Sequence, residues 1–406
     1  MSRPLATREA GAGRRRGPEL DVAVVGGGMV GAAAALALAR AGFASALIEA
    51  REPAPWRSED EVDLRVVGLA PSSIGLLDDL GVWTAIRQAR VGPYAHMHVW
   101  DAGSGAGIDF DAAANGQSEL GCIVENSLVQ SMLWQALDAA GVRRHCPAAV
   151  AGFEVREDRV QLALADGATL AARLLIAADG AGSPLRAMAG IGTRGRDYHQ
   201  RGVVAHVRTE RGHANTAWQR FLPTGPLALL PLADGRCSIV WSLPEAQAAR
   251  VLDLHEAAFC EAVGVASDFR LGRVTATSER AAFPLQLQLA ERYDAERFVL
   301  LGDAAHAVHP LAGQGVNLGL RDVFELRDTL VAARAGGRDI AAPHVLRRYA
   351  RRRRSANTLD ALGFDALARI YAWQAPPLVA MRGLGVRLLD RLDPLKQLVG
   401  GHAAGR

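Results

Sequence analysis

Residues 21–50 read DVAVVGGGMVGAAAALALARAGFASALIEA, and this stretch decides the fold. It starts at Asp21 with a β-branched run, turns at three successive glycines, continues as an alanine-rich run and closes with a second apolar run before Glu49. Apolar runs on either side of a helix-forming segment are typical of a strand–helix–strand unit. The stretch therefore predicts an α/β protein with a Rossmann-like nucleotide-binding domain.

Gly26, Gly28 and Gly31 form the pattern G-x-G-x-x-G where the first strand meets the helix. In that context Gly26 permits the tight turn, Gly28 lets the backbone approach a pyrophosphate, and Gly31 allows the helix to pack closely on the sheet. The first amides of the helix face the phosphates, and Glu49 would take the ribose hydroxyls. We expect a bound dinucleotide here; the alternative is a glycine turn that serves only packing.

The composition of the whole chain narrows the class of protein. Of 406 residues, 50% are hydrophobic and 22% are charged, which excludes general disorder, collagen and coiled coil. The net charge of +3 gives no electrostatic reason to expect a nucleic-acid partner. Four scattered cysteines without a C-x-x-C pair indicate a reducing compartment, and we predict a cytoplasmic protein. No uncharged apolar run is long enough to predict a membrane span.

Beyond residue 50 the sequence alternates between helical and strand patterns. Pro71 to Gly81 is predicted as a helix capped by Ser72 or Ser73. Ser127 to Ala140 is predicted as another helix, which stops at Gly141. After residue 191, short strands separated by turn residues predict a mainly antiparallel sheet.

Four parts of the chain are predicted from these patterns. The second domain is inserted into the first, because the nucleotide-binding texture returns at Arg297. The parts are a disordered basic arm (1–20), a discontinuous nucleotide-binding domain (21–190 and 285–340), a β-rich substrate domain (191–284) and a helical C-terminal region (341–406).

Two further segments carry a resemblance to a known family. Residues 178–186 read ADGAGSPLR, and residues 301–306 read LGDAAH. Together with the first glycine motif they resemble, in the expected order, the three fingerprints of the single-component (class A) flavin aromatic hydroxylases. The resemblance implies that the dinucleotide is FAD. In that family Asp179 would lie between the flavin and the nicotinamide route, and Asp303 would bind the ribityl chain.

Within that class the chain resembles the ubiquinone-biosynthesis hydroxylases. The matching segments are DLR at 63–65, VEN at 124–126 and GDAAHAVHPLAGQGVNLGLRD at 302–322. The resemblance extends from about Asp21 to the end of the chain. The residues that it places around the FAD, beyond the first motif, are Arg65, Asn126, Gln130, Asp179, Gly180, Gly302, Asp303, Pro310, Gly313, Gly315, Val316 and Asn317.

The glycines of the third segment support this placement independently. Gly313, Gly315 and Gly319 leave backbone amides uncovered at the opening of a helix, where they can stabilise negative charge on a reduced flavin. The alternative is an ordinary glycine-rich loop between strand and helix.

The resemblance also implies the reaction. The chain has one G-x-G-x-x-G motif, so NAD(P)H is expected to visit as a transient co-substrate and reduce the flavin. O2 then adds at flavin C4a, and the resulting hydroperoxide hydroxylates the ring of a polyprenylphenol in ubiquinone biosynthesis. His306 and His309 lack a third ligand at metal-binding spacing, so we predict no metal. We treat His309 as a candidate catalytic residue that tunes the hydroperoxide or the substrate phenol.

Other functions remain open at this stage. The same scaffold could hydroxylate another aromatic substrate, or the chain could be a non-catalytic FAD-binding subunit of a biosynthetic complex. A flavin halogenase is disfavoured because the seven tryptophans form no W-x-W pair.

The steepest local charge lies in the helical C-terminal region, at Arg347, Arg348 and Arg351 to Arg354. This cluster is a solvated helix face, or it contacts anionic lipid or other ubiquinone-biosynthesis proteins. Because a prenylated phenol is insoluble in water, we predict peripheral contact with the inner face of the membrane.

Overall fold

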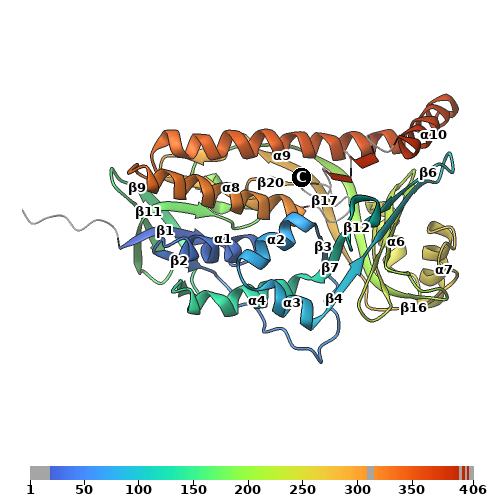
Figure 1. Ribbon diagram of the computed structural model, residues 1–406, viewed down its shortest axis with the longest axis horizontal. Helices are drawn as coiled ribbons and strands as arrows, with labels where there is room; N and C mark the ends of the chain where they lie inside the picture. The colour runs from blue at the N-terminus through green and yellow to red at the C-terminus, as the bar shows by residue number, and fades with distance from the viewer. Residues whose placement is uncertain (1–18, 309–314, 393–395, 398–399, 402–406) are drawn as a thin grey trace, which may run out of the picture.

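The computed structural model describes residues 19–308, 315–392, 396–397 and 400–401. Three sheets and a set of helices make one elongated molecule, with the long helix α9 along one side (Figure 1). The predicted His309, Pro310 and Gly313 lie outside the described residues, as does nearly all of the predicted basic arm.

The first sheet carries the nucleotide-binding texture. Its order is β18-β19-β11-β1-β2-β8, with β10 and β9 continuing from β11. β1 lies in the middle, parallel to both β2 and β11, and its apolar side chains are buried because helices cover the sheet. The strands are β1 (Leu20–Val25), β2 (Ser45–Ile48), β8 (Arg143–His145), β9 (Val150–Val155), β10 (Val160–Leu164), β11 (Thr169–Ala177), β18 (Asp294–Ala295) and β19 (Phe298–Leu300).

Three helices form the layer beside this sheet. α1 packs between α4 and α8, and its run of alanines lets these helices approach closely. Gly141 follows α4 with a φ of +75°, so the predicted stop signal is confirmed. The helices are α1 (Met29–Arg40), α4 (Asn126–Ala139) and α8 (Gly315–Ala335), with the short α5 (Pro184–Met188) after β11.

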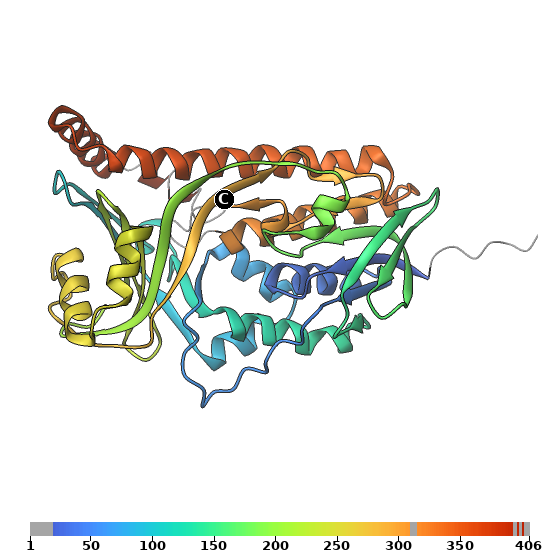
Figure 2. The same cartoon turned by 180° about the vertical axis from the view of Figure 1, so that it is seen from behind.

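The second sheet is mainly antiparallel, as predicted, and has nine strands in the order β20-β17-β12-β15-β14-β13-β5-β6, with β16 beside β12. β12 and β17 are long and run from the nucleotide-binding part into the far half of the molecule (Figure 2). The elements are β5 (His96–Asp101), β6 (Gly107–Asp111), β12 (Thr193–Thr209), β13 (Thr216–Leu222), β14 (Gly225–Pro231), β15 (Cys237–Pro244), β16 (Val274–Thr277), β17 (Ala281–Ala290) and β20 (His306–Ala307), with α6 (Glu245–Leu252) and α7 (Glu256–Ala266).

Two strands of this sheet come from an unexpected part of the sequence. β5 and β6 fall inside the range 21–190, yet β5 pairs in parallel with β13. A parallel partner more than a hundred residues later leaves no local pattern, because each strand alone shows only its own alternation. The predicted domain limits are not tested as a whole, but residues 96–111 and the short β20 at His306–Ala307 belong to the second sheet although they lie in ranges predicted for the nucleotide-binding domain.

A small third sheet, β3-β7-β4, connects the two larger ones. The predicted serine cap of α2 is wrong: the cap residue is Ala70, Pro71 occupies the first turn, and neither serine hydroxyl has a hydrogen-bond partner among the described residues. Pro71 explains this, because its missing amide needs no acceptor there. The elements are β3 (Val66–Leu69), β4 (Val91–Tyr94), β7 (Gly121–Glu125), α2 (Pro71–Asp79) and α3 (Trp83–Ala89), with 3-10 turns at Ala113–Asn115 and Gly302–Ala304.

The C-terminal region is helical, as predicted, in α9 (Pro343–Ala372) and α10 (Pro376–Arg391). α9 packs along α8 and continues past the second sheet, where α10 turns toward β6 (Figure 1). Asp101 of β5 and Arg382 of α10 form a buried ion pair, 2.9 Å between Oδ1 and Nη2, which fixes α10 to the sheet.

Candidate cofactor site

The turn between β1 and α1 has the geometry that its glycines predict. Gly26 has a φ of +106°, and a Cβ there would lie 2.2 Å from the carbonyl oxygen of Ala178. A Cβ on Gly31 would lie 1.9 Å from the carbonyl oxygen of Gly26. By contrast, a Cβ on Gly28 would meet no atom of the described chain within 4 Å. Gly26 and Gly31 therefore serve the fold, and Gly28 leaves an open face at the start of the helix.

Three side chains hold the peptide of Gly27 in place. Its amide donates to a carboxylate oxygen of Glu49, and its carbonyl accepts hydrogen bonds from Gln130 Nε2 at 2.7 Å and Trp134 Nε1 at 2.8 Å. Gln130 was predicted to lie beside the flavin, and the structure uses its amide nitrogen to brace the glycine turn. Trp134 was not predicted, and its one available signal was the spacing of four residues from Gln130 along a helix.

The second fingerprint packs directly against this turn. Asp179 accepts hydrogen bonds from Ser183 Oγ at 2.5 Å and from the Leu185 amide at 3.2 Å, while Gly180 has a φ of +86°. The Asp179 carboxylate thus orders the loop that leads into α5. The loop also contacts the first motif through Ala178, beside Gly26.

Arg186 joins the second fingerprint to the third. Its buried guanidinium donates to the carbonyl oxygens of Ala304 and Ala181, both at 2.8 Å. Burial lowers the pKa of this guanidinium, and the carboxylate of Asp179 acts in the opposite direction. Arg186 closes the ADGAGSPLR segment, but nothing in the sequence indicates which carbonyls its side chain reaches.

The third fingerprint meets the first through Val30. Gly302, with a φ of +55°, and Gly319 of α8 both face the Val30 side chain, and a Cβ on Gly319 would lie 2.6 Å from it. Three stretches far apart in the sequence, around residues 26–31, 178–186 and 301–306, are therefore in contact at one edge of the first sheet. This is the carboxyl edge of parallel strands, where open α/β sheets bind ligands.

A buried carboxylate supports the third fingerprint from behind. Asp322 of α8 accepts hydrogen bonds from the Gly302 amide at 3.0 Å, His306 Nε2 at 2.6 Å and Arg353 Nε at 2.7 Å. Burial alone would raise the pKa of Asp322, but His306 and Arg353 outweigh it and lower the pKa to about 2. His306 is therefore engaged in structure, and the network ties the Gly-Asp turn to α8 and α9.

Three predicted residues present polar groups that the described chain does not use. The Oδ1 of Asn126 is buried and has no hydrogen-bond partner. Neither the guanidinium of Arg65 nor the carboxylate of Asp303 has a hydrogen-bond or ion-pair partner among the described residues. Part of the Asp303 side chain is exposed to solvent, and many protein atoms surround it. The resulting desolvation raises the pKa of Asp303, and His306 acts in the opposite direction. Arg65 and Asn126 adjoin the paired ends of β3 and β7, Asp303 follows β19, and unpaired polar groups of this kind fit a polar ligand.

The start of α8 accounts for the remaining predicted residues that can be placed. Gly315 and Val316 open the helix, and a Cβ on Gly315 would meet nothing within 4 Å among the described residues. Asn317 is buried: its Oδ1 accepts from the Ala70 amide at 2.9 Å, and its Nδ2 donates to the Gly68 carbonyl at 2.7 Å. Its side chain thus fixes the first turn of α8 against β3.

Comparison with known proteins agrees with this geometry. A family model described as the FAD binding domain matches residues 19–359. The 3-demethoxyubiquinol 3-hydroxylase of Escherichia coli is 40% identical over 386 residues, 95% of this chain and 98% of that protein. Ubiquinone hydroxylase UbiL of Rhodospirillum rubrum is 37% identical over 95% of this chain and 89% of its own length. Human mitochondrial ubiquinone biosynthesis monooxygenase COQ6 is 35% identical over 99% of this chain and 96% of its own length.

Solved structures share the fold at low sequence identity. The p-nitrophenol 4-monooxygenase PnpA of Pseudomonas putida superimposes with a TM-score of 0.75 at 20% identity, over 95% of this chain and 98% of that one. Klebsiella pneumoniae HpxO, solved with FAD and uric acid, gives 0.71 at 21% identity, over 95% and 96% of the two chains. The predicted α/β fold with a helical C-terminal region is confirmed.

Proposed function

The chain belongs to the FAD-binding domain family, as its sequence resemblance indicated, and we propose that it is a ubiquinone-biosynthesis hydroxylase. The proposed reaction is the NAD(P)H- and O2-dependent hydroxylation of the aromatic ring of a polyprenylphenol. The contact of the three fingerprint segments at one sheet edge carries this proposal, because it builds one cradle for one dinucleotide. Similarity to ubiquinone hydroxylases along almost the whole chain supports the choice of substrate class.

The residues present fit FAD. The open face at Gly28 admits a pyrophosphate, and the Glu49 carboxylate, which already accepts from Gly27, retains lone pairs for ribose hydroxyls. Asp303 is available for the ribityl hydroxyls, and Arg65 and the unpartnered Oδ1 of Asn126 for the flavin end. Bound FAD supplies the redox chemistry, accepting a hydride from NAD(P)H and activating O2.

The chain itself contributes position and electrostatics. Gly180 and Asp179 hold the loop between the first and third motifs, and the amides that open α8 at Gly315 and Val316 carry the positive end of a long helix. Asn317 keeps that helix start in register with β3. We also propose that residues 310–317, with Pro310 and Gly313, border the flavin ring and that His309 tunes the hydroperoxide or the substrate phenol; positions 309–314 lie outside the described residues.

Substrate-stimulated turnover tests the proposal. The purified protein, reconstituted with FAD, should oxidise NADH or NADPH faster in the presence of a short-chain prenylphenol and should form the hydroxylated ring, detected by mass spectrometry. Bound FAD without any turnover would instead indicate a non-catalytic FAD-binding subunit. Equal turnover of phenols that lack a prenyl chain would indicate a hydroxylase of another aromatic substrate.

We further propose that the protein works in the cytoplasm, in peripheral contact with the inner face of the membrane or with other ubiquinone-biosynthesis proteins. No helix in the described part of the chain is both long and apolar enough to cross a bilayer. The prenylated substrate resides in lipid, so the enzyme must reach it from the surface. Flotation of the purified protein with anionic liposomes tests this contact, and indifference to lipid charge would contradict it.

A further inference from the structure

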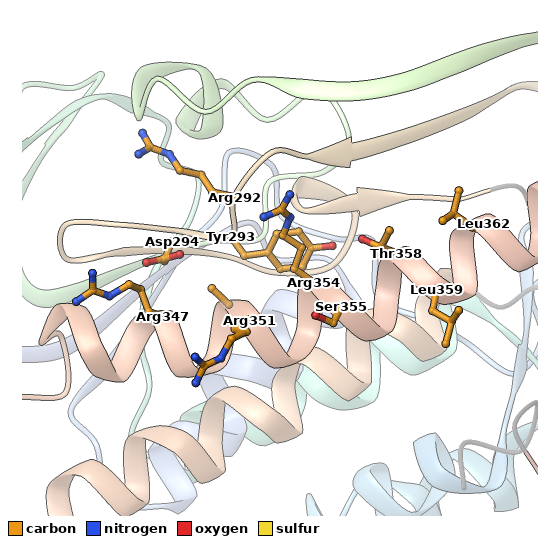
Figure 3. Close-up of a pocket in the computed structure, with 11 residues that line it drawn as sticks. Arg292, Tyr293, Asp294, Arg347, Arg351, Arg354, Ser355, Thr358, Leu359 and Leu362 are labelled. Atoms are coloured by element: carbon orange, nitrogen blue, oxygen red, sulfur yellow. The ribbon is translucent and has the colours of Figure 1, made fainter.

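A groove of about 650 Å³ lies between α9 and the turn that leads from β17 to β18. Figure 3 shows Arg292 on the side of that turn, opposite the side chains of α9. The groove is lined by Arg292, Tyr293, Asp294, Arg347, Ala350, Arg351, Arg354, Ser355, Thr358, Leu359 and Leu362. None of these residues belongs to the three fingerprint segments.

One end of the groove is strongly cationic. Four arginines line it, at positions 292, 347, 351 and 354, against the single carboxylate of Asp294. None of the four forms an ion pair with another described residue. Arg292 and Arg347 each donate one hydrogen bond to a backbone carbonyl, of Ala189 and Pro343, which leaves most of their donors free.

The neighbouring arginines of α9 show that this lack of partners is local. Arg352 pairs with Glu325 at 2.7 Å, and Arg353 pairs with Asp322 at 2.7 Å, on the face of α9 that packs on α8. The face of α9 that packs on α8 therefore carries arginines neutralised by carboxylates, whereas the arginines that line the groove have no ion-pair partner among the described residues. Unpaired guanidiniums that line one groove are the donor set that binds phosphate.

The other end of the groove is apolar. Leu359 and Leu362 are 67% and 55% exposed and lie one to two turns further along α9 than Arg354. The Ser355 and Thr358 hydroxyls lie between Arg354 and these leucines (Figure 3). Exposed apolar side chains continue in the same direction along α9 and α10, at Leu367, Trp373, Leu378, Met381, Leu384 and Leu388. Charge at one end and a lengthening apolar track at the other match a ligand with an anionic head and a hydrocarbon tail.

We propose that this groove binds the phosphodiester headgroup of an anionic phospholipid, whose acyl chains lie against the leucines of α9. The proposal rests on the peripheral membrane contact proposed above, for which it names a specific site. An acidic peptide would satisfy the arginines but would leave the leucines exposed to water, whereas a lipid satisfies both. The carboxylate of Asp294 would face the headgroup as the one unfavourable charge.

Co-sedimentation of the FAD-loaded full chain with vesicles tests the site. Vesicles of phosphatidylcholine alone are compared with an equimolar mixture of phosphatidylcholine and phosphatidylglycerol. The double variant Arg351→Gln/Arg354→Gln should bind the mixed vesicles about 25-fold more weakly, since each arginine near an anionic surface contributes about fivefold in affinity. FAD absorbance and hydroxylation of a soluble short-chain phenol should stay unchanged in this variant.

A matched control carries the same loss of charge outside the groove. Arg208 and Arg250 are exposed and do not line the groove, so Arg208→Gln/Arg250→Gln should retain the vesicle affinity to within about twofold, because screening limits distant charges. Equal weakening of both double variants would overturn the site, since it would show diffuse attraction, while peripheral attachment itself would stand. Equal binding of both vesicle types would overturn the lipid site and the peripheral membrane contact, but it would not contradict the proposed hydroxylase activity.

Calorimetry with soluble ligands distinguishes a lipid headgroup from free phosphate. Dihexanoyl-phosphatidylglycerol below its micelle concentration should bind the wild-type protein and lose most of this binding in Arg351→Gln/Arg354→Gln. Inorganic phosphate and glycerol phosphate should bind much more weakly, because they cannot use the leucines. Equal affinity for inorganic phosphate would overturn the lipid assignment, and so would Leu359→Ser/Leu362→Ser binding the short-chain lipid as tightly as the wild type.

Discussion

At Gly28 the cofactor, and not the fold, requires a glycine. Its backbone has a φ of −66°, which any residue can adopt, and a Cβ would meet no described atom within 4 Å. Gly28→Ala should therefore fold normally but bind FAD about tenfold more weakly or worse, since overpacking a close contact costs about 1–3 kcal/mol. Fluorescence titration of the apoprotein with FAD measures the affinity, and thermal melting of the apoprotein reports the fold.

Gly75 provides the control for that substitution. It lies within α2, away from the glycine motifs, and a Cβ there also meets no described atom within 4 Å. Gly75→Ala should leave FAD affinity unchanged and raise the free energy of unfolding by about 0.5–1 kcal/mol, because alanine favours a helix over glycine. If Gly28→Ala bound FAD as well as Gly75→Ala does, the pyrophosphate could not lie at this turn.

Asp322 gives the molecule a specific acid sensitivity. Its pKa is lowered from 3.8 to about 2 in the folded state, so its ionised form stabilises the fold above pH 4. That contribution is lost as the pH falls from about 4 to 2. Over this range the Asp322 carboxylate of the unfolded chain binds a proton while that of the folded protein is still ionised, so acid favours unfolding. Asp322→Asn should cost about 3–5 kcal/mol at pH 7, since it leaves Arg353 buried without its carboxylate.

Urea unfolding from pH 7 downward checks this prediction. The stability difference between wild type and Asp322→Asn should stay constant down to about pH 4 and narrow below it. An exposed carboxylate such as Asp328, replaced by Asn, is the control, and its effect should stay small, as exposed pairs contribute about 0–1 kcal/mol. A difference that widened on acidification would contradict the assigned direction of the pKa.

Among the elements, α10 is joined to β5 by one buried ion pair. Arg382 donates to both oxygens of Asp101 at 2.9 Å and to the carbonyl of Ile370 at 2.7 Å, where α9 approaches its end. The Arg382 side chain counters the effect of burial and lowers the pKa of Asp101. Arg382→Ala should release α10 from β5, and hydrogen exchange of α10 amides should accelerate while FAD content stays the same.

Arg387 on the same helix is the matched control. It is exposed, and within the part of the chain that the structure describes it donates only to the carbonyl of Gly383, one turn earlier, so Arg387→Ala should leave the exchange of α10 amides unchanged. Slow exchange in Arg382→Ala would show that other contacts hold the helix.

Elements with a local signal were predictable from sequence, and those defined by distant partners were not. The glycine turn, α4 with its Gly141 stop and the helical C-terminal region follow from spacing within a few residues. The pairing of β5 with β13 does not follow from local spacing, because the partner strand lies far along the chain. The start of α2 at Pro71 does not follow either, because both a proline and the serines after it can begin a helix. In both cases the tertiary contacts of the folded chain decide the structure.

The same division applies within the candidate site. Gly26 and Gly31 were predictable because the turn and the close packing of the helix dictate the residue type, and Gly28 because a pyrophosphate needs room beside the backbone. The braces were not: Trp134 and Arg186 act on backbone carbonyls, and a tryptophan or an arginine in a sequence shows nothing of which carbonyl it will reach. The resemblance implied that Gln130 lies beside the flavin, but it did not indicate that the Gln130 side chain donates to the carbonyl of Gly27 in the glycine turn.

For the whole molecule, the cofactor should act as a stabilising ligand because its cradle is built from three parts of the chain. FAD at a hundredfold excess over its Kd should raise the free energy of unfolding by about 2.7 kcal/mol. Urea denaturation of apoprotein and FAD-loaded protein measures this gain. The same addition to Gly28→Ala should give a smaller gain, and a gain equal to that of the wild type would contradict the shared cradle.

The order of strands β2-β1-β11-β19 has a consequence for how the protein is made. A ribosome releases the glycine turn first, the loop at Asp179 some 150 residues later and the turn at Gly302 later still. At about 5–20 residues per second, the early strand–helix–strand unit waits many seconds for its neighbours. A nascent chain stopped before Gly302 therefore lacks one wall of the cradle, and flavin capture has to follow synthesis of α8.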